Sequence, residues 1–221
     1  MRFLFALLAL CNSAVAAQIP EKLQYTINWP SGLSLGEGRI EATPSGAGWK
    51  FEMEFEAAVP GFRILDRFTS TVGGDQCSVL FEKNTAHGKR KSEEKIAFEN
   101  AEGKATRQTV GGGKSEFTVP ACAKDALAFL FHIRKELAQG RIPHAQNIYY
   151  GAAYRVRMES KGSQRIKIGD AYQDADRVLA YVKGPASEMA LEAFFGKDPA
   201  RTPLLVKVPL GMATFSVELV R

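Results

Sequence analysis

Alternation of apolar and polar residues is the dominant pattern along this chain. In the stretch KFEMEFE, residues 50–56, Phe51, Met53 and Phe55 alternate with charged side chains. The same two-residue period recurs over residues 23–29, 154–159 and 214–219. Such alternation predicts strands with one buried and one solvated face, whereas strands buried on both faces form continuous apolar runs. The sequence therefore predicts a mostly antiparallel sheet with water along one side.

Dense turn signals separate these segments and set the number of strands. Clusters of glycine and small polar residues occur at 43–48, 72–75, 110–113 and 160–163. KDPAR, residues 197–201, predicts a type I turn with Asp198 first and Pro199 second, where the fixed φ of proline fits. The pattern predicts about a dozen strands.

One segment, residues 123–140, follows a helical period instead. Asp125 places a carboxylate in the first turn, where the helix dipole favours it, and Gly140 suits the position just past the end. Leu127 and Phe131 widen the apolar face beyond what a surface helix needs. We expect this helix, the only convincing one in the mature chain, to pack against the sheet or into its concave face. Its apolar stripe consists of Ala126, Phe129, Leu130, Ile133 and Leu137.

The first sixteen residues have the features of a signal peptide. Arg2 precedes a short apolar run, and small residues at 14 and 16 suit a signal peptidase, so we expect cleavage after Ala16 or Ala17. Acylation of Cys11 as a lipoprotein is an alternative. The mature chain, residues 17–221, is expected to form a single β-rich domain without a transmembrane segment, soluble in the periplasm.

Removal of the signal leaves two cysteines, Cys77 and Cys122. An oxidising compartment and an even count favour a disulfide, and two buried free thiols are the alternative. The formal net charge is +5, and the densest basic cluster, residues 88–95, includes Glu93 and Glu94. Because this surplus is small and no aromatic residues interleave with it, nucleic acid is not an expected partner.

Several short motifs resemble catalytic or binding sequences but lack their context. GLSLG, residues 32–36, would make Ser34 a nucleophile, but a strand rather than a helix is predicted to follow it. GGGKS, residues 111–115, has Gln108 where a phosphate-binding loop needs its first glycine. A hydrolase that uses Ser34 is therefore the least favoured function.

The remaining candidates for metal chemistry are also weak. The histidines lack metal-ligand spacing, and the acidic residues lack the glycine and terminal glutamate of a calcium loop. We therefore predict no catalytic, cofactor-binding or metal-binding residues and no cofactor. The residues considered are His87, His132, His144, Asp170, Asp174 and Asp176.

Two segments, residues 122–143 and 183–221, carry a resemblance to a known family. The helix that ends in a basic, glycine-terminated turn and the later turn with Asp198, Arg201 and Pro203 resemble a family of exported Gram-negative proteins of unknown function. The resemblance implies a periplasmic location and a β-rich fold, with no established activity and no catalytic residues to transfer. For the turn itself we favour a structural role, in which Arg201 pairs with Glu192 or Asp198.

These observations together predict a mainly β fold: a single curved antiparallel sheet, as a half-barrel or lipocalin-like barrel, packed around one α-helix. Two stacked sheets would need no helix in the core. By analogy of fold with periplasmic carriers, we expect a non-catalytic protein that binds an apolar ligand, a lipid or a lipidated partner such as a lipoprotein. A structural or interaction module of the cell envelope with a solid core is the alternative.

Overall fold

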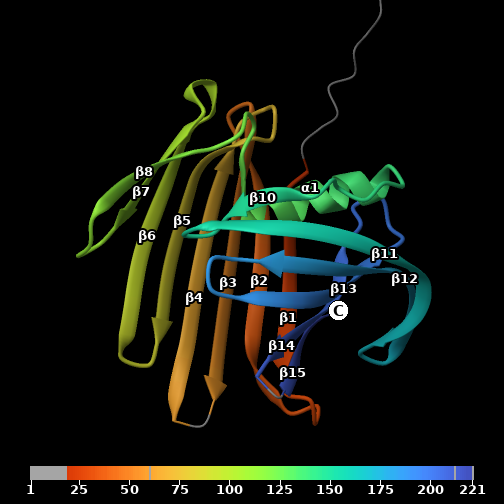
Figure 1. The fold of residues 1–221 in the computed structure, drawn as a ribbon. Helices are drawn as coiled ribbons and strands as arrows, with labels where there is room; N and C mark the ends of the chain where they lie inside the picture. Colours follow the sequence, from red (N-terminus) through yellow and green to blue (C-terminus); the bar gives the residue numbers. More distant parts are fainter. Residues whose placement is uncertain (1–18, 60, 212, 221) are drawn as a thin grey trace, which may run out of the picture.

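A computed structural model describes residues 19–59, 61–211 and 213–220 (Figure 1). The signal peptide predicted for residues 1–16, including Cys11, lies outside these described residues. The described chain forms one fifteen-stranded sheet, with neighbours in the order β8-β7-β6-β5-β4-β3-β2-β1-β15-β14-β13-β12-β11-β10-β9. The fold is thus mainly β with one α-helix, α1 (Ala126–Ala138), and a short 3-10 helix, η1 (Asn100–Glu102).

The strands follow the alternating segments, and glycine-containing turns join most of them. The strands are β1 (Glu21–Asn28), β2 (Ser34–Ser45), β3 (Gly48–Val59), β4 (Phe62–Val72), β5 (Ser78–His87), β6 (Arg90–Glu99), β7 (Lys104–Thr109), β8 (Lys114–Thr118), β9 (Lys124–Asp125), β10 (Gln146–Tyr149), β11 (Ala153–Ile168), β12 (Ala171–Lys183), β13 (Glu188–Gly196), β14 (Pro203–Leu210) and β15 (Ala213–Leu219).

Almost every strand pair is antiparallel, as the alternation predicts. The exception is β9, a two-residue strand that pairs in parallel with β10. A parallel pair needs a crossover connection, and α1 supplies it here between β9 and β10. A strand of two residues has no periodicity, so the sequence pattern could not reveal it.

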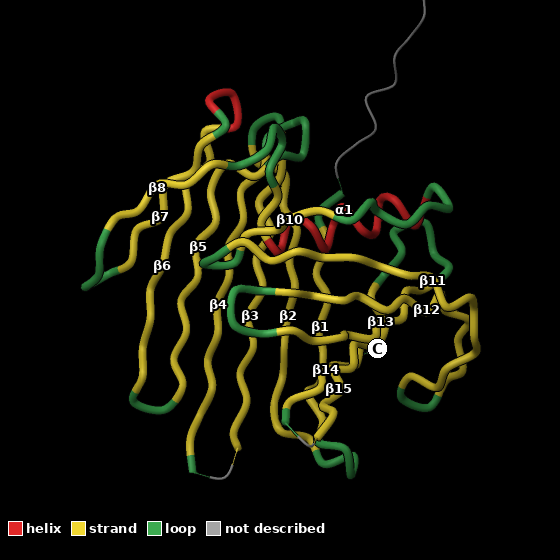
Figure 2. Tube along the Cα trace, viewed as in Figure 1, coloured by secondary structure: helices red, strands yellow, loops and turns green. Residues whose placement is uncertain are grey.

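The sheet curves around α1, which lies between two walls of strands (Figures 1 and 2). Leu127 and Ala128 pack with Phe51 and other residues of β2–β7, while Phe129 and Ile133 pack on the opposite side with residues of β10–β13. The cross-strand register connects these two walls through one continuous face of the sheet. That face is concave, and the prediction of a single curved sheet packed around one helix is confirmed.

A buried carboxylate fixes where α1 begins. Asp125 is fully buried, and its Oδ1 accepts hydrogen bonds from the amides of Leu127 and Ala128, each 2.9 Å away. Its Oδ2 accepts from the hydroxyls of Ser70 on β4 and Ser78 on β5, each at 2.6 Å. Asp125 is therefore the N-cap, one residue before the first turn in which the sequence placed it. Burial raises the pKa of Asp125, and these four hydrogen bonds act in the opposite direction.

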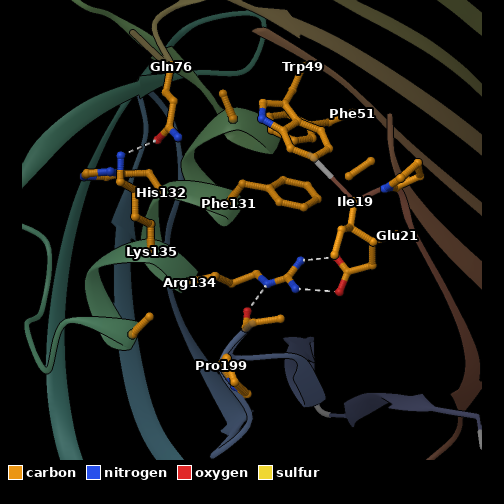
Figure 3. Close-up of a pocket in the computed structure, with 15 residues that line it drawn as sticks. Ile19, Glu21, Trp49, Phe51, Gln76, Phe131, His132, Arg134, Lys135 and Pro199 are labelled. Carbon is orange, nitrogen blue, oxygen red and sulfur yellow. Dashed lines mark hydrogen bonds and ion pairs between the residues drawn. The ribbon is translucent and has the colours of Figure 1, made fainter. Parts of the chain in front are cut away.

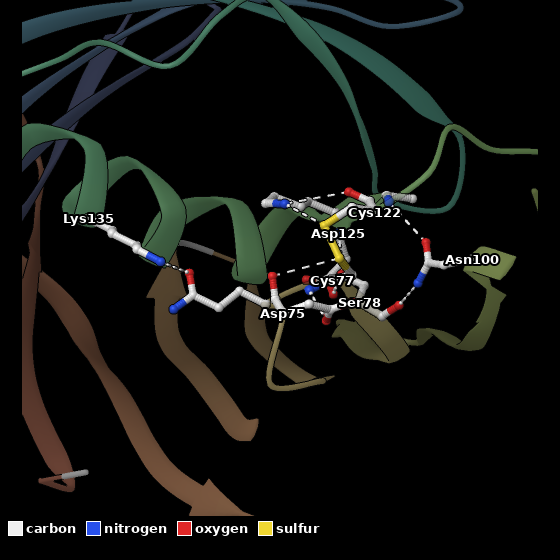
Figure 4. Close-up of a disulfide and its surroundings, with 10 residues drawn as sticks. Asp75, Cys77, Ser78, Asn100, Cys122, Asp125 and Lys135 are labelled. Atoms are coloured by element: carbon white, nitrogen blue, oxygen red, sulfur yellow. Dashed lines mark hydrogen bonds between the residues drawn. A yellow bond between two sulfur atoms is a disulfide. The ribbon is translucent and has the colours of Figure 1, made fainter. Parts of the chain in front are cut away.

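A disulfide lies beside this anchor (Figure 4). Cys77, in the loop before β5, is bonded to Cys122, just before β9, with 4.6 Å between their Cα atoms. Asn100 supports the same junction, since its amide nitrogen donates to the carbonyl of Ser78 at 2.8 Å and its amide oxygen accepts from the amide of Ala123 at 3.0 Å. The chain entering α1 is therefore held to β5 by covalent and polar contacts.

Replacing Asp125 should destabilise the protein strongly. We expect Asp125→Ala to lower the free energy of unfolding by about 3 kcal/mol, because it removes a helix cap and leaves buried hydroxyls and amides unpaired. Urea denaturation followed by circular dichroism measures this. Asp170→Ala, at an exposed turn, is the matched control and should change stability by less than about 0.5 kcal/mol. Similar effects for the two variants would contradict the anchoring role.

The disulfide should stabilise the fold further, because it restricts the conformations of the unfolded chain. A double Cys77→Ser, Cys122→Ser variant is expected to lose about 3–4 kcal/mol of unfolding free energy in the chain-entropy model, because the bond closes a loop between residues 45 positions apart. Wild-type protein should show the same difference in unfolding free energy between denaturation without a reducing agent and denaturation with one. An unchanged denaturation midpoint would show that the bond contributes nothing.

Candidate functional site

A pocket of about 580 Å³ lies between α1 and the first three strands (Figure 3). We call it the α1 groove. By the strand register, its residues on β1, β2 and β3 belong to the concave face of the sheet. Small alanine side chains from both the helix and the sheet leave its centre open. The groove is lined by Ile19, Pro20, Glu21, Ala42, Trp49, Phe51, Gln76, Ala128, Phe131, His132, Arg134, Lys135, Ala138, Pro199 and Ala200.

Aromatic rings form one wall of the groove. Phe131 of α1 stacks on Phe51 of β3, with 3.8 Å between ring centroids and 7° between their planes. Trp49 continues the stack, 6.3 Å from Phe51 at an interplanar angle of 11°. Apolar side chains are thus presented to the pocket by the first part of β3, which contains the alternating KFEMEFE stretch.

An ion pair closes the other side of the groove. Arg134 is buried on α1, and its two terminal nitrogens donate to the carboxylate of Glu21 at 2.6 and 2.7 Å. Its Nε donates to the carbonyl of Ala200 at 2.9 Å, and its guanidinium carbon lies 5.0 Å from the ring centroid of Phe131. A bidentate pair with a further carbonyl satisfies most of the guanidinium's donors, so this charge is neutralised inside the fold.

The rim of the groove is polar and carries positive charge. Lys135 is exposed and donates from Nζ to the amide oxygen of Gln76 at 3.3 Å. His132 lies one helical turn before it and is partly buried. Burial lowers the pKa of His132 below its usual value, and the nearby charge of Lys124 acts in the same direction. These effects disfavour the charged form of His132, and the exposed Lys135 supplies positive charge at the rim.

Beyond the groove, the concave face continues as an apolar surface that α1 does not cover. Met53 and Phe55 follow Phe51 on the same face of β3 but are only partly buried, whereas Phe51 is buried. Cross-strand register extends this face around the sheet to β13–β15. We call this partly buried surface the concave floor; it comprises Ile27, Met53, Phe55, Ile64, Leu191, Val206, Val208, Phe215 and Val217.

A cluster of paired charges occupies another part of the concave face. Glu94 on β6 is buried, with Nζ of Lys83 3.4 Å from its Oε1 and Nε of Arg107 2.6 Å from its Oε2. Lys83 also lies over the ring of Tyr150, 4.6 Å from its centroid. This cluster crosses β5, β6 and β7, so the concave face is polar there and apolar from β1 to β3.

The turn after β13 differs from its sequence-based interpretation in one contact. The carbonyl of Asp198 accepts the amide of Arg201 at 3.0 Å across Pro199, and the Asp198 carboxylate accepts the Thr202 hydroxyl at 3.0 Å. Arg201, however, pairs with Asp176 at 2.8 Å rather than with Glu192 or Asp198. Asp176 comes from β12, a neighbouring strand that sequence proximity could not indicate. Pro203 begins β14, and its carbonyl accepts the Tyr25 hydroxyl at 3.1 Å.

The motifs discounted in the sequence lie apart from one another. Ser34 begins β2 after a hairpin turn and is exposed, with no helix behind it. The three glycines of the GGGKS stretch lie between β7 and β8, and its Lys114 and Ser115 begin β8. His87 contacts Asp66 at 2.8 Å, His132 lines the α1 groove, and His144 is exposed.

The described residues contain no group of three or more His, Cys, Asp or Glu side chains that could hold a metal ion. Within the same part of the chain, no helix has the length and apolar character needed to cross a bilayer.

Comparison with known families gives a match over most of the chain. A family described as "Protein of unknown function (DUF3108)" matches residues 24–220, nearly the whole described chain. The chain belongs to the DUF3108 family. The family description assigns no function, and a search of curated proteins gave no match.

A solved structure shows the same fold. The crystal structure of a beta-barrel-like protein of the DUF1849 domain of unknown function from Brucella abortus is similar, with a TM-score of 0.68. The alignment covers 92% of this DUF3108 chain and 96% of that chain, at 9% sequence identity. At this identity the similarity concerns the fold alone.

Sequence reasoning missed the ion pair that closes the groove. Arg134 lies within the predicted helix, but it was not singled out as a buried residue. Its partner Glu21 is 113 residues away, at the start of the first strand. The only available signal was the position of Arg134, four residues after Leu130 on the apolar stripe, where a charged residue on a buried face requires a partner.

Removing the carboxylate of this pair should destabilise the fold. We expect Glu21→Gln to lower the free energy of unfolding by about 3 kcal/mol, because it leaves the buried Arg134 guanidinium without its counter-charge. Adding Arg134→Met should restore part of the loss. Glu116→Gln is the matched control, since its pair with Lys114 is exposed and spans 3.7 Å; it should cost less than about 0.5 kcal/mol. Equal effects of the two glutamine variants in thermal denaturation would contradict the assignment.

Proposed function

We propose that this protein binds an apolar ligand, such as the acyl chain of a lipid or lipidated partner, on the concave side of its sheet, as a non-catalytic component of the periplasm. The observation that carries the proposal is the contrast along β3. Phe51 is buried beneath α1, whereas Met53 and Phe55 on the same face are left partly exposed beside an open groove.

The size and lining of the site support this proposal. A volume of about 580 Å³ falls within the range of roughly 300–1,000 Å³ that is typical of small-molecule sites. Ten of the fifteen lining residues are apolar, and the other five are the Arg134–Glu21 pair and the polar residues of the rim. Surfaces of this kind in monomeric proteins commonly mark binding sites for ligands or partners.

The location and the non-catalytic role rest on other grounds. The first sixteen residues have the pattern of a secretory signal, which favours export. The candidate nucleophile Ser34 is on an exposed hairpin and is not among the residues that line the α1 groove. These features favour a carrier or binding protein over a hydrolase.

Binding of a neutral fluorescent probe tests the proposal. N-phenyl-1-naphthylamine should bind the delipidated protein, and Phe55→Glu should weaken binding by about tenfold, because a carboxylate on the concave floor must be desolvated by the ligand. Leu65→Glu is the matched control: Leu65 is also partly buried but pairs with Glu56 and lies on the convex face. Native mass spectrometry of protein purified from its own periplasm should also reveal a co-purifying apolar molecule.

Two outcomes would overturn the proposal. The first is a delipidated protein that does not bind the probe and carries nothing when purified. The second is equal probe binding by wild-type protein and both glutamate variants. Capture of a protein partner from envelope extracts without any lipid would instead favour an interaction module with a solid core.

A further inference from the structure

The charge around the α1 groove narrows the class of ligand. Glu21 is the only carboxylate among the described lining residues, and Arg134 occupies both of its oxygens. A cationic head group entering the groove would therefore find no free counter-charge on its walls. The polar groups that remain available are on the rim, where Lys135, Gln76 and His132 lie together (Figure 3).

Lys135 is well placed to receive an anion. Its Nζ is exposed and contacts only the neutral amide oxygen of Gln76 within the described residues. The amide nitrogen of Gln76 and a ring nitrogen of His132 are further donors on the same rim. An oxyanion at the rim would thus meet an ammonium and two neutral donors.

A second lysine, Lys124, lies just before the start of α1. Lys124 is 8% exposed, and its Nζ has only the carbonyl oxygen and Sγ of Cys122 as hydrogen-bond partners in the described chain, at 3.5 and 3.3 Å. Burial lowers the pKa of Lys124, while the carboxylates of Asp75 and Asp125 act in the opposite direction. Lys124 therefore adds less to the charge of the rim than the exposed Lys135 does.

The apolar part of the groove suits a chain attached to such an anion. From the rim, the pocket continues between the stacked rings of Phe131, Phe51 and Trp49 on one side and the neutralised Arg134–Glu21 pair on the other. Ala42, Ala128 and Ala138 keep the space between them open. Among the described lining residues, the charges beyond the rim are paired with each other, so these walls favour an apolar tail.

We propose that the α1 groove binds an anionic amphiphile, with its carboxylate or phosphate head on Lys135 and its single apolar chain along Trp49, Phe51 and Phe131. This inference rests on the proposed function and adds the charge and position of the head group. Charge complementarity at the rim and the apolar wall behind it are its two independent supports.

Trp49 provides a direct readout, since the chain has only two tryptophans. Trp29 lies at the other end of β1 against Phe215, so a Trp29→Phe background makes Trp49 the sole reporter in the groove. Decanoate, decyl phosphate, 1-decanol and decyltrimethylammonium are titrated into this protein as monomers. Butyrate and inorganic phosphate test whether an anion without a long tail suffices.

The expected result is an order of affinity among ligands of equal chain length. Decanoate and decyl phosphate should bind about fivefold more tightly than 1-decanol, and decyltrimethylammonium should bind more weakly than 1-decanol. The preference for the anionic ligands should shrink at high salt. Butyrate and phosphate should leave Trp49 emission unchanged. Lys135→Gln should abolish the preference for anions, whereas Lys114→Gln, an equivalent change at the distant β8, should preserve it.

The failures of the two proposals are distinguishable. If decanoate and decanol bind equally and Lys135→Gln has no effect, the head-group inference is overturned while apolar binding stands. If none of the ten-carbon ligands changes Trp49 emission and the neutral naphthylamine probe also fails to bind, both proposals fall. A response to inorganic phosphate alone would show a simple anion site and would also overturn the inference.

Discussion

The fold depends on a fully buried carboxylate that holds the start of a helix to two strands. Asp125 caps α1 and at the same time accepts hydrogen bonds from serines on β4 and β5. An ionised carboxylate away from water is costly unless its oxygens are occupied, and here four donors occupy them. The same residue belongs to β9, which starts the crossover to β10. One side chain therefore positions the helix against one wall of strands and brings the other wall beside it.

The dimensions of α1 explain why the concave face is only partly filled. A helix is about 10 Å across, whereas the twelve residues of β3 extend roughly 40 Å. Because α1 runs across β1–β4 rather than along them (Figure 1), it covers only a band near one end of β3. Phe51 lies under that band, and Met53 and Phe55 lie beyond it. The alternating apolar residues of β3 thus lie in the core at one end of the strand and on an open surface further along it.

Local patterns predicted much of this architecture, and the limits of the prediction are equally physical. Two-residue alternation identified the one-faced strands, and the 3.6-residue period identified the helix to within a few residues. The contacts that position the helix were out of reach because they join distant residues: Asp125 lies 55 residues from Ser70, and Arg134 lies 113 residues from Glu21. Arg201 shows the same limit, since its partner Asp176 is adjacent only after β12 and β13 have paired.

The charged residues of the concave face form ion pairs inside the fold and leave a lysine at the rim of the groove. Glu94 is buried there and pairs with the partly buried Lys83 and Arg107, and the buried Arg134 pairs with the partly buried Glu21. Both of these buried ions therefore have a counter-charge, as low-dielectric surroundings require. Lys135 at the rim of the groove is exposed, and its described contact is an amide oxygen. Because water solvates an exposed ammonium, Lys135 needs no partner for stability, and in the proposal above its free donors are where the head group of an anionic ligand would bind.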